Sequence, residues 1–330
     1  MLLDIIGGSG FIGTRLCSRL DAEHSCNFSI VDKVSSKSYP ERVKIANVQS
    51  IDALRMVITD GAVIINLAAE HRDDVRPLSL YDEVNVVGAK NICVVAREKN
   101  VKTIVFTSSV AVYGFAPIST DESGQIAPFN DYGRTKYEAE QVYKAWQAEA
   151  PDIRTLVIVR PTVVFGEQNR GNVYNLLRQI ASGKFVMVGD GENRKSMAYV
   201  ENVAAFLQYA VGFKPGVHIH NYIDKPDSTM NELVGTVNRM LGKPEQIGLR
   251  LPFALGYAVG KCFDALAAVT GKKFPISSIR VKKFCSNSVF ETSIAKTGFV
   301  PPVLLSDALE RTVRHEFIES HEGDGVFYTE

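Results

Sequence analysis

A glycine-rich turn near the N-terminus constrains the fold of this chain more than any other feature. The apolar run "LLDII" leads into Gly7, Gly10 and Gly13, with Phe11 and Ile12 between the last two, and the helical pattern "TRLCSRL" follows. Glycines at this spacing between a strand and a helix make a tight turn, let the backbone approach a pyrophosphate and point a helix N-terminus at it. The glycine triplet alone is weak evidence, but its position predicts a dinucleotide-binding turn.

Short apolar runs alternate with longer amphipathic ones through the first half of the chain. "NFSIVD", "AVIINLAA" and "KTIVFTSS" have the pattern of strands, and helical patterns separate them. Such alternation is typical of βαβ units around a buried parallel sheet. After "LVIVRPTVVFG" the pattern becomes mixed. We predict an α/β fold with a Rossmann-type doubly wound parallel sheet in residues 1–165. A smaller mixed α/β substrate domain should span residues 166–330 and end in a flexible tail at 321–330.

Composition excludes several classes of function. The 330 residues hold 37 Lys+Arg and 37 Asp+Glu, so no global charge favours a nucleic acid. The five cysteines are scattered and never spaced as C-x-x-C, which indicates neither a disulfide framework nor a zinc site. We expect no metal, since His218 and His220 lack further ligands at suitable spacing. No signal-peptide pattern opens the sequence, and a reducing cytosol fits best.

An acidic residue ends the second predicted strand. Asp32 follows the glycine turn by about twenty residues, where a carboxylate binds the ribose hydroxyls of NAD and repels the additional phosphate of NADP. Lys33 lies next to it and weakens this discrimination. We therefore predict NAD as the cofactor.

A tyrosine and a lysine stand four residues apart in "DYGRTK", at the start of a helical pattern. Tyr132 and Lys136 would share one helical face, where an ammonium can lower the pKa of a phenol and make it a usable base. A solvated pair would have the same pattern. Ser108 and Ser109 end a predicted parallel strand, at the sheet edge where ligands bind, although strand-end capping is the alternative. A hydroxyl, a phenol and an ammonium can thus converge beside a nicotinamide.

Seven motifs together resemble one family. "GGSGFIG", "NLAAEHRDD", "NVVGAKNI", "FTSSVAVYG", "YGRTK", "RPTVVFG" and "GDGENRKSMAYVENVA" occur in the order of the extended short-chain dehydrogenase/reductase family, in its NAD-dependent sugar epimerase and dehydratase branch. The resemblance implies that Tyr132 is the catalytic base and that Lys136 binds the ribose and lowers the tyrosine pKa. It also implies that Ser109 bridges the substrate hydroxyl and that Asn85 is a structural fourth member.

The resemblance also implies a cofactor site built from the ends of the predicted strands and the helix with Tyr132. Its predicted members are Gly7, Gly10, Phe11, Ile12, Gly13, Asp32, Lys33, Asn47, Val48, Asn66, Leu67, Ala68, Ala69, Ser108, Tyr132, Lys136 and Pro161. One departure from the family lies at Asn47 and Val48, where an acidic residue usually contacts adenine. An amide can still form a hydrogen bond there.

The family's reactions share the removal of a hydride from the sugar C4 and differ in the next step. Dehydratases carry Asp-Glu where this chain has Val110 and Ala111, and two apolar side chains cannot move the protons that elimination requires. The resemblance therefore implies 4-epimerisation through a transient 4-keto sugar. The predicted substrate-binding residues are Glu70, His71, Ser109, Arg170, Asn172, Arg194 and Lys195. A cluster of donors in the second domain is suited to a diphosphate: Arg160, Arg170, Asn172, Arg194 and Lys195. Either Arg194 or Lys195 matches the family's phosphate-binding arginine.

The segment 251–283 indicates whether the enzyme binds its substrate in solution or at a membrane surface. Lys261 and Asp264 interrupt its apolar run, so it falls short of a transmembrane helix but suits an amphipathic helix at an interface. Its basic residues, which favour an anionic membrane surface, are Lys272, Lys273, Arg280, Lys282 and Lys283. A core helix of the second domain is the alternative.

Within the family, "AAEHRDDVRPLSLYDEVNV" and "SSIRVKKFC" resemble bacterial epimerases that convert undecaprenyl-diphosphate-linked N-acetylglucosamine to the N-acetylgalactosamine form for O-antigen synthesis. This implies a peripheral homodimeric enzyme at the inner face of the cytoplasmic membrane. The dimer would use residues 79–99 and the helix with Tyr132. A soluble UDP-N-acetylhexosamine 4-epimerase, a 4-keto sugar reductase and a non-catalytic dinucleotide sensor are the alternatives.

Overall fold

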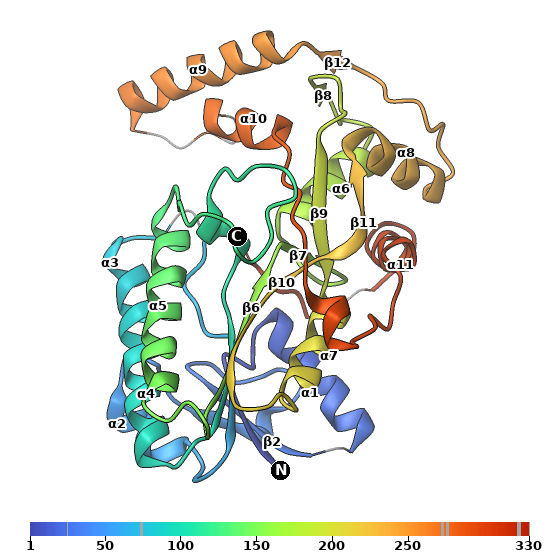
Figure 1. Ribbon diagram of the computed structural model, residues 1–330. Coiled ribbons are helices and arrows are strands. Elements are labelled where there is room, and N and C mark those ends of the chain that lie inside the picture. Colours follow the sequence, from blue (N-terminus) through green and yellow to red (C-terminus); the bar gives the residue numbers. More distant parts are fainter. Residues whose placement is uncertain (25, 73–74, 272–273, 275–276, 322–324, 330) are drawn as a thin grey trace.

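A seven-stranded sheet organises the molecule (Figure 1). The computed structural model describes every residue except 25, 73–74, 272–273, 275–276, 322–324 and 330. All neighbouring strands of this sheet are parallel, in the order β10-β6-β5-β4-β1-β2-β3. The strands are β1 (Leu2–Ile6), β2 (Asn27–Asp32), β3 (Val43–Ile45), β4 (Val63–Asn66), β5 (Thr103–Thr107), β6 (Thr155–Pro161) and β10 (Gly216–Tyr222). The predicted α/β class and doubly wound parallel sheet are confirmed.

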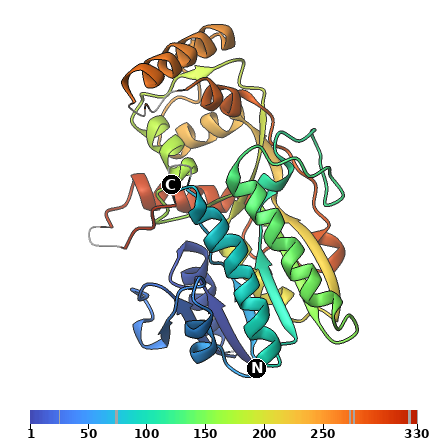
Figure 2. The ribbon, with the colours of Figure 1, turned by 90° about the vertical axis from the view of Figure 1, so that its left-hand side faces the viewer.

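Helices cover both faces of this sheet, which explains why its central strands are apolar on both sides. On one face, α1 (Phe11–Glu23) and α7 (Val200–Ala210) pack together over the core that includes Leu16 and Phe206. On the other face lie α2 (Ile51–Val57), α4 (Gly88–Glu98) and α5 (Asp131–Ala148). Figure 2 shows α4 and α5 side by side in front of the sheet.

The strand order reverses between β1 and β4, and ligands bind at such a point, beyond the carboxyl ends of the strands. The glycine turn follows β1, and Ser108 and Ser109 follow β5. Short helical segments complete this half: η1 (Pro40–Arg42), α3 (Ser79–Tyr81), the π-helical η2 (Asp82–Val87) and the 3-10 turn η3 (Val110–Tyr113). The glycine turn and the two serines therefore meet at one edge of the sheet.

A second group of elements packs beyond that edge. Its members are β7 (Val163–Phe165), β8 (Met187–Val188), β9 (Arg194–Tyr199), β11 (Asp224–Thr229), β12 (Arg250–Leu251), α6 (Asn172–Ala181), α8 (Met230–Met240) and α11 (Leu305–Phe317). The short turn η4 (Ile294–Thr297) instead packs against β10, and Ile294 joins the core under α1 and α7. Phe11 joins their hydrophobic core, so the glycine turn touches both halves. The chain returns to the main sheet through β10, which pairs with β6. The domain boundary at residue 165 stays a prediction.

Helices α9 (Phe253–Thr270) and α10 (Ser278–Cys285) lie together, away from the main sheet (Figure 1). A Cβ on Gly260 would approach the Ser278 backbone to 2.7 Å, and the Ser278 hydroxyl donates to Asp264 at 2.5 Å. Within α9, all of which the structure describes, only Gly256 and Gly260 are buried. The alternative of a core helix is therefore wrong. Of the described helices, α9 is the one long and apolar enough to cross a membrane by length and composition.

Candidate active site

The glycine turn has the geometry that a pyrophosphate requires. Gly7 has φ +78°, and a Cβ there would lie 2.6 Å from the Ala68 nitrogen. A Cβ on Gly13 would lie 2.5 Å from the Gly8 Cα, so α1 approaches β1 closely. Gly10 is the N-cap of α1 and provides no side chain to cap its amides. The turn thus offers a cradle that side chains would fill, with helix-terminal N–H groups for an anion, and it fits the predicted cofactor.

Asp32 is fixed beside this turn. Its carboxylate accepts hydrogen bonds from the backbone N–H groups of Ser9 at 3.0 Å and Val34 at 3.2 Å. Lys33 is exposed. The structure therefore places Asp32, as predicted, at the carboxyl end of β2 next to the helix N-terminus.

The two residues that depart from the family pattern follow β3. The Asn47 side chain accepts from the Gln49 N–H at 3.1 Å and donates to the Gln49 side chain at 2.8 Å. Val48 is buried, and a Cβ on Gly88 would lie 2.9 Å from its side chain. The amide of Asn47 is thus occupied within its own turn.

Asn85 ties the loop after β4 to the helix that carries Tyr132. It is buried in the π-helical turn η2, where its side chain accepts from the Glu70 N–H at 2.9 Å and donates to the Glu70 carbonyl at 3.0 Å. It also donates to the Thr135 hydroxyl at 2.9 Å. Asn66 fixes the same loop by accepting from the Ala68 N–H at 3.0 Å. These bonds hold Leu67, Ala68 and Ala69 against the glycine turn.

Ser109, Tyr132 and Lys136 occupy the sheet edge between β5 and α5. Asn130 caps α5 by accepting from the Gly133 N–H at 2.9 Å, so the helix begins one residue before Tyr132. The Ser109 hydroxyl forms a hydrogen bond with the Tyr132 phenol. Lys136 is 2% exposed, and its ammonium lies 4.4 Å from the centre of the Phe106 ring. The structure thus brings the serine and the tyrosine into contact, with the lysine one turn further along.

Burial dominates the electrostatics of this pair. It raises the pKa of Tyr132, and the hydrogen bond with Ser109 lowers it by less. Burial also lowers the pKa of Lys136 to about 7, while the negative charge of Glu140 opposes that change. We predicted a tyrosine pKa below its ordinary value. The structure gives the opposite direction, because the cost of a buried phenolate exceeds the stabilisation by its neighbours.

A buried charge network behind the site was not predicted. The Glu140 carboxylate accepts from the Ser108 hydroxyl at 2.6 Å and from the Arg160 guanidinium at 2.8 Å and 2.6 Å. Arg160 also donates to the Tyr113 hydroxyl, which donates to Asn221. Arg160 therefore does not belong to a diphosphate-binding cluster, and that prediction is wrong. The available signal was Glu140 itself, one turn beyond Lys136 on the inward face of α5.

The remaining predicted diphosphate donors have separate partners. Arg170 forms a 2.7 Å ion pair with Glu316. Arg194 is exposed and donates to the Asp227 carbonyl at 3.2 Å. Lys195 donates to the carbonyls of Lys283 and Ser286 at the end of α10, and burial lowers its pKa to about 8. Asn172 is the exposed first residue of α6, and Pro161 is the buried last residue of β6.

His71 lies close to the lysine of the site. Desolvation by the surrounding protein lowers the pKa of His71, although part of the residue is exposed. The charge of Glu70 raises this pKa, and the charge of Lys136 lowers it. The ring also forms hydrogen bonds with the backbone of Ala69 and of Thr329, near the end of the chain. Glu70, held by Asn85, precedes it in the same loop. These two predicted substrate residues therefore lie in the loop that Asn85 ties to the helix with Lys136.

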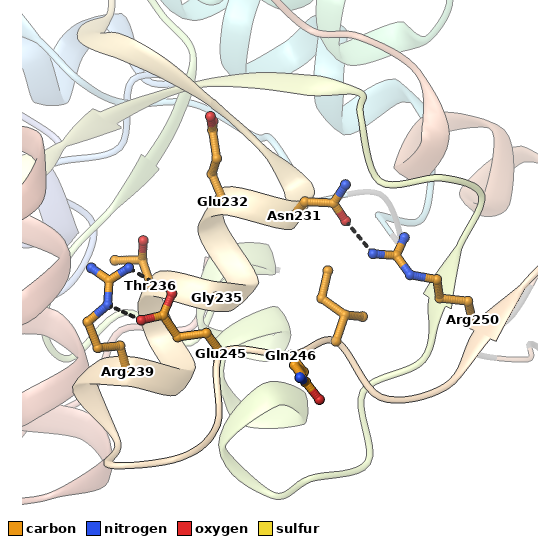
Figure 3. A pocket seen from close by; sticks show the side chains of 9 residues that line it. Asn231, Glu232, Gly235, Thr236, Arg239, Glu245, Gln246 and Arg250 are labelled. Carbon is orange, nitrogen blue, oxygen red and sulfur yellow. Dashed lines mark hydrogen bonds and ion pairs between the residues drawn. The ribbon is translucent and has the colours of Figure 1, made fainter.

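A pocket away from the catalytic edge is lined by other residues (Figure 3). It measures about 660 Å³ and lies between α8 and the segment that follows it. Arg239 pairs with Glu245 at 2.6 Å, and Arg250 donates to Asn231 at 3.0 Å. None of the described residues that line this pocket is a predicted site residue. We therefore do not assign the active site to it.

Comparisons with known proteins agree with this geometry. The model of the NAD dependent epimerase/dehydratase family matches residues 4–221. A protein of Escherichia coli O157:H7 named N-acetyl-alpha-D-glucosaminyl-diphospho-ditrans,octacis-undecaprenol 4-epimerase is 47% identical over 328 residues, which cover 99% of this chain and 98% of the relative.

Two solved structures share the fold. UDP-glucose 4-epimerase of Thermus thermophilus, in complex with NAD, has a TM-score of 0.72 at 19% identity over 96% of this chain and 98% of the other. UDP-N-acetylglucosamine 4-epimerase from Methanobrevibacter ruminantium, in complex with UDP-N-acetylmuramic acid, has a TM-score of 0.72 at 21% identity over 95% and 97%. The family match confirms NAD as the predicted cofactor, and the chain belongs to the NAD dependent epimerase/dehydratase family.

Proposed function

We propose that this enzyme is an NAD-dependent 4-epimerase that interconverts N-acetylglucosamine and N-acetylgalactosamine linked by diphosphate to undecaprenol, for O-antigen synthesis. The observation that carries the proposal is the 47% identity, over nearly the whole of both chains, to a relative named for a 4-epimerase of this kind. The alignment covers 99% of this chain, which leaves at most a few residues outside it. It therefore includes most of the α9–α10 segment, where a lipid could be met.

The chemistry follows from the side chains at the sheet edge. NAD, when bound, supplies the hydride acceptor for the sugar C4 and gives the hydride back. Tyr132 takes the proton of the C4 hydroxyl and later returns one. Ser109, which is hydrogen-bonded to the phenol, positions that hydroxyl. Because burial raises the pKa of Tyr132, its deprotonation needs positive charge close by, and Lys136 is the buried cation one turn away.

The residues after Ser109 support epimerisation over dehydration. Val110 and Ala111 open the 3-10 turn η3, whose hydrogen bond from the Ala111 N–H ends on the Ser109 hydroxyl at 3.1 Å. Neither side chain can donate or accept a proton. A 4-keto sugar held here would therefore receive its hydride back, on either face, instead of losing water.

The exposed face of α9 supports a membrane-bound substrate. Its exposed large apolar residues are Phe253, Leu255, Val259, Leu266 and Val269. Lys261 lies on the same helix, and Arg280 and Lys282 are exposed on α10, so basic groups accompany the apolar ones. Lys272 and Lys273 lie outside the described residues. We place the enzyme in the cytoplasm, on the inner face of the cytoplasmic membrane.

Helix α10 connects that surface with the active site. The Lys282 ammonium lies 5.1 Å from the centre of the Phe115 ring, and the Lys283 ammonium lies 4.5 Å from the centre of the Phe129 ring. Phe115 and Phe129 contact each other at a centroid distance of 5.0 Å. Both belong to the segment that joins Ser109 to Tyr132. A sugar held at this membrane-facing side would thus be near the catalytic residues.

The test is an assay with NAD and two substrates, undecaprenyl-diphosphate-N-acetylglucosamine and UDP-N-acetylglucosamine, each scored for inversion at C4 of the released sugar. We expect inversion of the lipid-linked sugar with no net consumption of NAD. Inversion of the UDP sugar alone would make the chain a soluble epimerase, and stoichiometric use of reduced cofactor would make it a reductase. We also expect a homodimer through α4 and α5, which light scattering of the purified enzyme checks.

A further inference from the structure

The last described residues of the chain return to the cofactor side of the molecule. Beyond α11, residues 325–329 run back toward the region between the two halves (Figure 2). The Phe327 N–H donates to the Gln168 carbonyl at 2.9 Å, and the Arg170 N–H donates to the Phe327 carbonyl at 2.8 Å. We call residues 325–329 the C-terminal strap.

The strap contacts three points that follow the direction of the predicted dinucleotide. Gly325 lies beside Lys37, in the loop after Asp32, where a Cβ would be 3.5 Å from the lysine side chain. The ring of Phe327 packs on Phe11, at the N-terminus of α1, with centroids 5.8 Å apart.

The third point is at the nicotinamide end. The backbone of Thr329 forms a hydrogen bond with His71, whose pKa responds to the charge of Lys136. The Thr329 hydroxyl also donates to the Asn169 side chain at 2.6 Å. The strap therefore extends from the ribose-binding loop, past the pyrophosphate turn, to His71 in the loop after β4.

The chemistry of the strap suits a cover. Its sequence, "GVFYT", carries no charge that would repel a diphosphate. An epimerase also needs its cofactor to stay bound, because the hydride taken from the sugar must return to the same sugar. We propose that the C-terminal strap closes over bound NAD and slows its release, with Phe327 as the positioning residue that holds the strap on the pyrophosphate turn. The proposal rests on the cofactor and not on the identity of the sugar.

The test compares two neighbouring substitutions in the full-length enzyme. Phe327→Ala removes the contact with Phe11, whereas Tyr328→Ala is the matched control, since Tyr328 is 73% exposed. The enzyme is loaded with NADH, excess NAD is added, and the loss of NADH fluorescence gives the release rate without any sugar. We expect release about tenfold faster in Phe327→Ala and unchanged in Tyr328→Ala. Unchanged or slower release in Phe327→Ala would overturn the proposal.

A second measurement needs no substitution and holds even if Phe327→Ala fails to fold. Hydrogen exchange of the wild-type chain reports on the amides of Phe327 and Arg170, which form the two backbone bonds of the strap. A closing strap requires both amides to exchange several-fold more slowly with NAD than without it. Equal or faster exchange with NAD would show that the strap does not close on the cofactor.

Discussion

Two regions of this molecule contrast in what they bury. Behind the catalytic edge, Glu140 and Arg160 are ionised side chains with 0% and 3% exposure, and they pair with each other at 2.6 Å. On α9, large apolar side chains lie in contact with solvent, and Val269 is 86% exposed. Both regions depart from the usual distribution of charged and apolar residues.

The two regions differ in whether other residues of the chain satisfy the unusual side chains. A buried charge is tolerated only when partners inside the protein satisfy it, and the Ser108–Glu140–Arg160–Tyr113 network does so completely. Among the described residues, α9 packs against α10 and the β8 region, and these contacts leave its large apolar side chains exposed. The first region is therefore a finished interior that positions the site, and the second has a surface suited to something outside the chain.

We expect the largest effect, a loss of turnover, from a substitution at the catalytic end of the interior region. Tyr132→Phe removes the proposed base while keeping the ring, so we expect turnover to fall by about 10²–10⁴-fold. Binding of NADH, followed by fluorescence, should persist. Tyr137→Phe on the same helix is the control and should retain activity. Full activity in Tyr132→Phe would exclude the phenol as the base.

Removal of one member of the buried pair should have the next largest effect. Glu140→Gln leaves the Arg160 guanidinium buried without a counter-charge, which should lower the free energy of unfolding by about 3–5 kcal/mol. Glu138→Gln is the matched control on the outer face of α5, where its pair with Arg134 is 42% and 38% exposed, and it should cost ~0–1 kcal/mol. Urea denaturation measures both, and equal losses would contradict the contrast.

The buried lysine should make stability depend on pH. The pKa of Lys136 is about 7 in the folded chain and near 10.5 when unfolded, so the folded state binds fewer protons between these values. Stability must then rise with pH across that window. From pH 7 to pH 9, NAD-free wild type should gain ~2 kcal/mol relative to Lys136→Met. Parallel curves for the two proteins would show that the ammonium is not desolvated.

The outer region should respond without any change in folding. Val269→Glu alters an exposed side chain, so the free energy of unfolding should stay within ~0.5 kcal/mol of wild type. Binding to vesicles that contain anionic lipid should nevertheless weaken by about tenfold. Met56→Glu on α2 is the control, because Met56 is 81% exposed on the opposite half of the molecule. Equal vesicle binding by all three proteins would remove the membrane from the proposal.

The sequence was informative where the site depends on local spacing. The glycine turn, Asp32 and the Tyr132–Lys136 pair each lie within one short segment, and the structure places them at one sheet edge. The Glu140–Arg160 pair was not predicted, because its partners lie on different elements and meet only through packing. In the second half, where the sequence pattern is mixed, the apolar run "KFVMVG" contains only the two-residue strand Met187–Val188, which pairs with β12.

The folding of distant segments explains the other differences. Strand β10 joins the main sheet from the second half of the chain, and the strap contacts Phe11 from more than three hundred residues away. Neither contact has a local signature. The exposure of α9 depends on which elements pack against it in the folded chain. An apolar helical pattern looks the same for a buried core helix and for an exposed helix, so the sequence alone does not separate them.

The π-helical turn at Asp82–Val87 has a consequence for how this family member can change in length. A π turn holds one residue more than a regular helical turn, and each residue of a helix rotates the chain by about 100°. Deletion of a single residue there would turn the Asn85 amide away from both Glu70 and Thr135. The segment can therefore accept a new side chain at Val87, its exposed residue, but a change of one residue in its length would separate the substrate loop from the catalytic helix.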